Sequence, residues 1–140
     1  MTPRKLMVHT DVIVEHLAGD RSPSTLRRAA GTALCYTTVL QAAEVLALAR
    51  TPSELHAVEE CLGVLKILGI NARQSPRYGR LLAAHPRLAP ADLLAAAVAI
   101  DAGLPVLTDR PGCFRGIRGL TIVRGRALRT ADLSAGSHGV

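Results

Sequence analysis

The chain has 140 residues, and 49% of them are hydrophobic, so it can fold as one domain around a buried core. Its formal net charge is +6, which favours a polyanionic partner such as nucleic acid. Two tyrosines and one phenylalanine are the only aromatic residues, which excludes a binding surface of stacked aromatic side chains. The three cysteines show no C-x-x-C spacing, which argues against a disulfide framework or a zinc ribbon and favours a reducing, cytoplasmic location.

The sequence also argues against membrane association. The apolar run from Leu93 to Ile100 is far shorter than the roughly 20 residues that a membrane helix requires. Behind the basic start of the chain, Asp11, Glu15 and His16 interrupt the hydrophobic residues, so no export signal is expected. We therefore expect a soluble protein with no membrane partner.

The first half of the chain alternates short apolar runs with helical patterns. Thr10 or Asp11 can cap the first helix, and Gly19 ends it. In chain order, the expected elements are a strand at 6–8, a helix at 12–18, a short helix ending before Gly31, a strand at 33–39 and a helix at 41–50.

The second half continues the same alternation. Pro52 opens an amphipathic helix, and the spacing of Leu55, Val58 and Leu65 extends this helix as far as Gly69. The remaining expected elements are a short or broken helix at 72–86, a helix at 91–102 that Gly103 ends, a strand at 104–108 and a strand at 120–123.

This alternation of strands and helices predicts an α/β fold with a parallel sheet flanked by helices. We expect a single domain over residues 1–140, with a core over about 6–123 and a polar C-terminal extension at 124–140.

Four isolated acids stand in the most apolar parts of the chain: Asp11, Glu44, Asp92 and Asp109. A carboxylate among aliphatic side chains costs several kcal/mol unless it is paired or binds a metal ion. Ligand sites of parallel sheets form beyond the carboxyl ends of the strands, and Asp11 and Asp109 each follow an expected strand. The four acids are therefore expected to converge on a divalent cation.

Each acid also has a simpler explanation. Asp11 can be a helix cap, Asp92 a first-turn acid favoured by the helix dipole, and Asp109 an ordinary turn residue. Glu44 is hardest to explain in this way, because its apolar neighbours leave no plainly solvated face on the helix between Val39 and Ala49.

Three runs of the sequence carry a family resemblance, MVHTDVIVEHL, YTTVLQAAEVLALA and LAPADLLAAAVAIDAGLPVLTDRPGCFRGIRGLTIV. Together, from Leu6 to Val123, they resemble the PIN-domain family, and particularly the VapC-type toxins of toxin–antitoxin pairs. The third run is the most specific, because Asp92-Leu-Leu-Ala-Ala-Ala, Thr108 and Phe114 occur in the family's order. The resemblance implies a PIN-like, Rossmann-like fold and a ribonuclease in which the acids hold Mg²⁺ or Mn²⁺.

The chain departs from the family pattern at two positions. His9 stands where the first strand of the family normally ends in its leading Asp, and Asp11 follows two residues later. Asp109 directly follows Thr108, whereas the family usually places an acid or amide one residue further on, where Arg110 stands. A guanidinium group at that place would oppose cation binding.

His9 bears directly on the choice of metal. Imidazole is a softer ligand than carboxylate, so His9 should weaken Mg²⁺ relative to Mn²⁺ or Zn²⁺. His9 can be a ligand, a partner of a ligand or a proton carrier, or it can be a strand-end histidine with its hydrogen bonds satisfied.

The expected reaction is metal-dependent hydrolysis of RNA phosphodiester bonds by Asp11, Glu44, Asp92 and Asp109. Thr38 and Thr108 would orient a ligand or a water molecule. Arginines after the last acid could bring the RNA backbone to this edge, or could simply form a solvated basic surface, and they include Arg110, Arg115, Arg118, Arg124, Arg126 and Arg129.

Two other functions remain open from the sequence. The first is a catalytically impaired PIN-like domain, marked by His9, that binds RNA or a protein. The second is a phospho-acceptor or nucleotide-binding module, which the lack of a glycine-rich phosphate loop after a strand disfavours. The family resemblance further implies an antitoxin partner and a homodimer formed through the helices after Glu54 and around Leu81.

Overall fold

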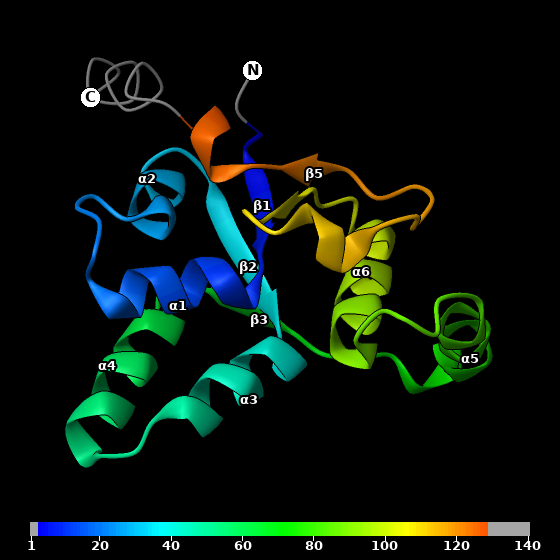
Figure 1. Cartoon of the computed structure of the whole chain (residues 1–140), viewed down its shortest axis with the longest axis horizontal. Helices are drawn as coiled ribbons and strands as arrows, with labels where there is room; N and C mark the ends of the chain where they lie inside the picture. Colours follow the sequence, from blue (N-terminus) through cyan, green and yellow to red (C-terminus); the bar gives the residue numbers. More distant parts are fainter. Residues whose placement is uncertain (1–2, 129–140) are drawn as a thin grey trace.

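The computed structural model describes residues 3–128, which form a five-stranded parallel sheet flanked by helices (Figure 1). This confirms the predicted α/β fold. The strands are β1 Lys5–Val8, β2 Leu34–Thr38, β3 Lys66–Leu68, β4 Val106–Leu107 and β5 Ile122–Val123. The helices are α1 Thr10–Ala18, α2 Thr25–Ala30, α3 Val39–Leu48, α4 Pro52–Leu62, α5 Ser75–Ala84 and α6 Pro90–Ala102, with 3₁₀ turns at Ala72–Gln74, Pro111–Phe114 and Gly125–Ala127.

The strand order is β3-β2-β1-β4-β5, so the chain moves outward from β1 to β3 and then returns to build the other side. The direction of winding therefore reverses between β1 and β4. In the register of this pair, Val8 lies opposite Leu107, which places the next residues, His9 and Thr108, side by side beyond the strand ends. Such a reversal point is where parallel sheets form their ligand sites.

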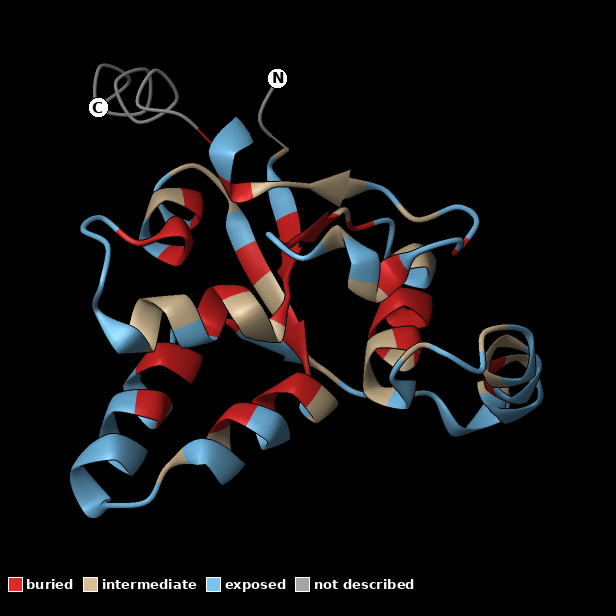
Figure 2. Ribbon diagram, in the orientation of Figure 1, coloured by how far each residue is buried: buried red, intermediate tan, exposed pale blue. Residues whose placement is uncertain are grey.

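Alternate residues of β1 face two separate hydrophobic clusters. Leu6 and Val8 pack with residues of α1, α2, α3 and α4, while Met7 packs with α6 and with Phe114. Because successive side chains of a strand point to opposite faces, helices α1 to α4 and helix α6 cover opposite faces of the sheet. Figure 2 shows the buried residues concentrated on the inner strands β1, β2 and β4, on α6 and on the inner ends of other helices.

The prediction of a helix from Pro52 to Gly69 is wrong beyond Leu62. Helix α4 ends at Leu62, and β3 follows at the edge of the sheet, where Tyr36 of β2 pairs with Lys66. The turn at Gly63 breaks the helix, but Leu65 still falls at helical spacing and is buried, so periodicity continues across the break. A strand of three residues cannot be separated from a helix end by periodicity alone.

The helix starts after β1 and β2 also differ from expectation. Neither Thr10 nor Asp11 caps α1, because His9 occupies the N-cap position and makes no side-chain capping bond. Helix α3 begins at Val39, where Thr38 and Gln41 form a reciprocal capping box.

Helix α3 has a plainly exposed face, contrary to expectation. Glu44 is exposed, and so are Val39 and Leu48, whose exposed fractions are 45% and 58%. The apolar residues around Glu44 therefore do not enclose it, because this side of α3 points away from the sheet.

The segment after β5 packs against the domain rather than extending from it. Leu128 is buried in the same cluster as Leu26, and the guanidinium group of Arg28 donates hydrogen bonds to the carbonyl oxygens of Gly125 and Leu128. Residues 124–128 thus pack against the folded domain, and the rest of the expected extension, including Arg129, lies outside the described residues. Within residues 3–128, no helix is long and apolar enough to cross a membrane.

Candidate functional site

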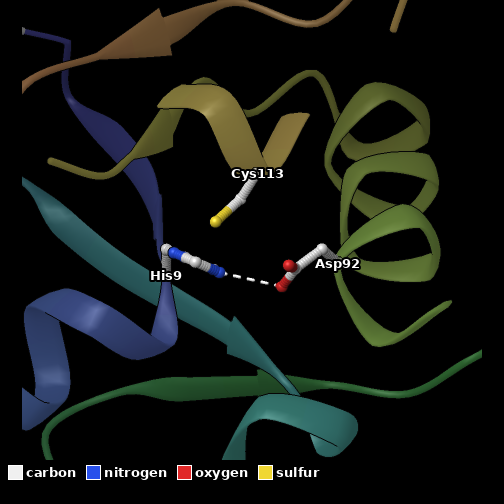
Figure 3. A group of neighbouring side chains, drawn as sticks. All are labelled: His9, Asp92 and Cys113. Carbon is white, nitrogen blue, oxygen red and sulfur yellow. Dashed lines mark hydrogen bonds and ion pairs between the residues drawn. The ribbon is translucent and has the colours of Figure 1, made fainter. Parts of the chain in front are cut away.

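Side chains from four separate segments meet beyond the ends of β1 and β4. His9 follows β1 directly, Asp11 lies in the first turn of α1, and Asp92 lies in the first turn of α6. Thr108 follows β4, and Cys113 comes from the 3₁₀ turn Pro111–Phe114. Figure 3 shows His9, Asp92 and Cys113 pointing toward one another.

His9 lies between two carboxylates. Its Nδ1 atom is 2.9 Å from Oδ1 of Asp11, and its Nε2 atom is 2.9 Å from Oδ1 of Asp92. The residue is only 4% exposed, and its ring meets the ring of Phe114 edge-on at a centroid distance of 4.9 Å. The imidazole is therefore fixed in orientation by contacts on both nitrogens and on its ring.

The two carboxylates change the protonation of His9. Burial by itself lowers the pKa of His9, but the hydrogen bonds and charges of Asp11 and Asp92 outweigh it and raise the pKa from 6.5 to about 9. At neutral pH, His9 is therefore an imidazolium that donates one hydrogen bond to each acid. This cation stands where the family resemblance placed a leading carboxylate.

Asp11 is held by a second set of donors. The Thr108 hydroxyl lies 3.1 Å from both carboxylate oxygens of Asp11, and the Asp109 amide donates to Oδ2 at 2.9 Å. Burial raises the pKa of Asp11, but the hydrogen bonds from His9 and from the Asp109 amide outweigh it, so the pKa is lowered. The Arg110 amide in turn donates to the Thr108 oxygen at 3.0 Å, which fixes that hydroxyl.

The other two predicted acids lie outside this cluster. The Glu44 carboxylate is exposed and accepts a hydrogen bond of 3.0 Å from the Thr10 hydroxyl, one residue beyond His9. The Asp109 carboxylate accepts from the Gly125 amide at 2.8 Å, so it is engaged with the segment after β5. Asp109 therefore reaches the cluster through its backbone amide, which bonds to Asp11.

The two predicted threonines lie in different surroundings, and the predicted RNA-binding arginines lie at the surface. The Thr38 hydroxyl is buried in the capping box with Gln41, whereas Thr108 contacts both His9 and Asp11. Arg110, Arg115 and Arg118 are all exposed. The positive charge of Arg110 is close enough to lower the pKa of the Cys113 thiol, although burial and the charge of Asp92 outweigh it and raise that pKa.

Arg115 borders a pocket of about 280 Å³. His85 and Arg87, from the connection between α5 and α6, also line this pocket. Phosphate groups are the ligands that the guanidinium groups of Arg87 and Arg115 attract.

Cys113 and Thr10 were not singled out as site residues from the sequence. Cys113 is a single cysteine with no ligand spacing, and it becomes relevant only because the turn containing Phe114 folds back over β1 and α6. Thr10 gave no signal beyond its place as a helix cap. Both are brought to the site by tertiary contacts alone.

The donor atoms do not fit Mg²⁺. Within residues 3–128, one group of three potential ligands has its donor atoms within 4.8 Å of one another, and it consists of His9, Asp92 and Cys113. Mg²⁺ requires oxygen ligands in near-ideal octahedral geometry, whereas this group offers nitrogen, oxygen and sulfur. The imidazolium also already pairs with Asp11 and Asp92 and offsets one of their two negative charges, so a hard cation would have to displace it.

Known proteins resemble the chain in sequence pattern and in fold. The family model of the PIN domain matches residues 6–110. VapBC from Salmonella typhimurium, solved bound to DNA, gives a TM-score of 0.74 at 20% identity, covering 88% of this chain and 99% of that one. VapBC2 from Rickettsia felis, bound to a fragment of promoter DNA, gives 0.70 at 18% identity, covering 86% and 98%.

A third solved structure, VapBC-5 of the VapBC family of toxin–antitoxin systems from Mycobacterium tuberculosis, gives a TM-score of 0.59 at 25% identity. The match covers 87% of this chain and 99% of that one. No curated protein matches the chain significantly.

Proposed function

The chain belongs to the PIN-domain family, and we propose that it is a VapC-like toxin that hydrolyses RNA phosphodiester bonds in the cytoplasm. One observation carries the proposal. Asp11 and Asp92, from segments far apart in the sequence, meet at the reversal point between β1 and β4, with Glu44 at the rim beside Thr10. A group of carboxylates in a chain of net charge +6 matches a nuclease that attracts a polyanion and acts on it at one edge.

Nucleases of this family generally use divalent metal ions, which supply charge stabilisation at the scissile phosphate. Of the two ions expected from the sequence, Mn²⁺ suits a nitrogen ligand better than Mg²⁺ does, and His9 becomes such a ligand only when the ion displaces the proton on Nε2. Asp11 and Asp92 supply the negative charge of the site, and Thr108 and the Asp109 amide keep Asp11 in position. His9, as an imidazolium, orients both acids and cannot serve as a base near neutral pH.

The proposed path of the RNA backbone runs from the site toward the basic turn after β4. Arg110 is exposed and close to Thr108, and Arg115 lines the 280 Å³ pocket together with Arg87. Binding through such phosphate contacts weakens steeply as the salt concentration rises.

The experiment is a cleavage assay on labelled RNA with Mg²⁺, Mn²⁺, Co²⁺ and Zn²⁺ in turn. We expect cleavage that EDTA abolishes and that Asp92→Asn reduces at least about a hundredfold, since one ligand or charge at the reacting centre carries several kcal/mol. Asp101→Asn is the matched control, because Asp101 lies on the same helix but is exposed and paired with Arg77. Equal activity in the two variants would refute the assignment of the site.

A second function is favoured by the ion pairs of His9. A PIN-like domain whose two acids stay paired with His9 instead of a metal ion would bind RNA or protein without cleaving either. In that case, the wild type would bind RNA in fluorescence anisotropy and leave it intact with every metal ion. His9→Asp would then introduce Mg²⁺-dependent cleavage, because it restores the leading carboxylate.

The similar solved structures are toxin–antitoxin complexes, and we propose an antitoxin partner for this chain. Its surface would be the groove of about 260 Å³ between α1, α3 and α4, where Val14 and Leu48 are 38% and 58% exposed. Co-expression of a candidate antitoxin should relieve growth arrest caused by the chain. Leu48→Glu should keep the toxicity but lose the relief.

We also propose a homodimer, through α4 and α5 as the family resemblance implies. Sedimentation equilibrium of the purified chain gives the oligomeric state directly. A monomer at micromolar concentration would rule out a stable dimer.

A further inference from the structure

We propose that Nε2 of His9, Oδ1 of Asp92 and Sγ of Cys113 form a binding site for a thiophilic transition metal ion of the Zn²⁺ class. The site would leave a fourth position open to water or to a ligand. This inference goes beyond the proposed function and does not rest on it, because it concerns which ion the cluster binds and not what the protein cleaves.

The donor set determines the class of ion. Thiolate, imidazole and carboxylate together are characteristic ligands of Zn²⁺ and of similar borderline-soft ions, whereas Mg²⁺ takes oxygen almost exclusively. Three protein ligands with one open position are the usual arrangement of catalytic zinc sites, while structural sites use four. Within residues 3–128, this is the only group of three such side chains with mutually close donor atoms.

The spacing of the donor atoms requires only small movements. Ligands about 2.0–2.3 Å from a shared tetrahedral ion lie roughly 3.3–3.8 Å from one another. Nε2 of His9 and Oδ1 of Asp92 are 2.9 Å apart and must open slightly, and all three donor atoms already lie within 4.8 Å. In Figure 3 the three side chains converge on a common point from β1, from α6 and from the turn between them.

The surroundings of His9 match those of a metal-bound histidine. Such a histidine almost always donates its second ring N–H to a carboxylate, a backbone carbonyl or a water molecule, which fixes the ring and makes the other nitrogen a better ligand. Asp11 accepts from Nδ1 of His9 at 2.9 Å, and Thr108 and the Asp109 amide hold Asp11 in turn. In this chain, the Asp11 carboxylate therefore holds the Nδ1 side of His9, while Nε2 of His9 faces Asp92 and Cys113.

The three cysteines differ in access to this position. Cys35 and Cys61 are buried in the cluster on the α1 to α4 face, whereas Cys113 is partly exposed on the other side of the sheet. Phe114, which is buried against His9, anchors the turn that carries Cys113. On binding, the ion replaces the thiol proton of Cys113 and the proton on Nε2 of His9, and both protons pass to the solvent.

The test is titration of the purified full-length chain with Co²⁺, in reducing buffer, followed by absorption spectroscopy. We expect a thiolate-to-cobalt charge-transfer band in the near ultraviolet and the strong visible bands of a tetrahedral ion. Zn²⁺ should abolish both, and a large excess of Mg²⁺ should leave both unchanged.

Cys113→Ser should abolish the charge-transfer band, and Cys61→Ser, which removes a thiol elsewhere, should retain it. Asp11→Asn should keep the band but weaken Co²⁺ binding about 10–100-fold, as loss of an outer partner does. Circular dichroism tests whether each variant is folded. If Cys113→Ser does not fold, Asp92→Asn provides a second variant that lacks one ligand.

Absence of the band in folded wild type at saturating Co²⁺, or its persistence in Cys113→Ser, would overturn the proposal. Neither result depends on RNA. A chain that cleaves RNA without this metal site, and one that has the site but leaves RNA intact, are therefore separate and recognisable outcomes.

Discussion

Two regions of the molecule differ in whether their functional side chains have partners within the chain. At the β1 and β4 ends, every site carboxylate has partners: His9, Thr108 and a backbone amide surround Asp11, and His9 pairs with Asp92. On the outer face of α3 and α4, apolar side chains such as Leu48 lie in solvent. The first region holds its charges by internal pairing, and the second leaves its apolar surface for a partner to cover.

Removal of His9 should cause the largest loss of unfolding free energy. His9→Ala leaves Asp11 and Asp92 facing each other without their shared cation, and loss of one member of a buried ion pair costs about 2–4 kcal/mol. Urea unfolding at pH 7 in EDTA measures this loss. His56→Ala is the control, because the His56–Glu60 pair is exposed, and it should cost less than about 0.5 kcal/mol. Similar losses in the two variants would contradict the assigned role of the buried pair.

The same pair predicts how stability depends on pH. The folded-state pKa of His9 is about 9, above its ordinary value of 6.5, so its contribution is complete below pH 6.5 and is lost as pH rises toward 9. We expect the metal-free protein to lose on the order of 2–3 kcal/mol of unfolding free energy over this range. Because the folded-state pKa of Asp11 is lowered, Asp11 also contributes stability, which is lost as the pH falls below the ordinary pKa of an aspartate. His9→Gln should remove the alkaline loss, and an unchanged profile would sink this account.

A third substitution tests the contact between the Asp109 carboxylate and Gly125, in the segment after β5. A Cβ at Gly125 would lie 2.9 Å from both Oδ2 of Asp109 and Cγ2 of Thr25, which is too close for ordinary contact. Gly125→Ala should therefore cost about 1–3 kcal/mol in thermal or urea unfolding. Gly69→Ala is a useful comparison, since a Cβ there meets no atom within 4 Å.

The smallest effect is expected on the outer face. Leu48→Ala should change the unfolding free energy by less than about 0.5 kcal/mol, because this side chain is 58% exposed. Val45→Ala on the same helix removes a fully buried side chain and should cost about 2 kcal/mol. Equal costs would mean that the α3 face is covered in solution, for example by a second copy of the chain.

Much of the fold follows from local pattern. The strands around Met7, Tyr36 and Val106 and the helix ended by Gly103 are all where composition and stop signals placed them. The start of β3 was not predicted, since Lys66–Leu68 is too short to interrupt a helical periodicity by itself. Its pairing with β2, which lies far back in the sequence, makes it a strand.

The site was predicted in part. The sequence placed Asp11 just beyond the first strand and Asp92 at the start of the helix that precedes the strand at 104–108, and it singled out His9 as a departure from the family pattern. The position of His9 between both acids could not be read from the sequence, because it depends on the register of β1 with β4 and on the placement of α6. The direction of the Asp109 carboxylate likewise depends on the path of the chain at Gly125.

The amino-acid sequence by itself determined the alternating architecture, the basic charge and the residue types available to the site. These are properties of local periodicity and composition, which act within a few residues. Tertiary structure alone decided which charges are paired, that Cys113 joins His9 and Asp92, and that Glu44 stays in solvent. Electrostatic pairing and metal ligation act over a few ångströms, and only the folded sheet with its helices brings such distant residues within that range.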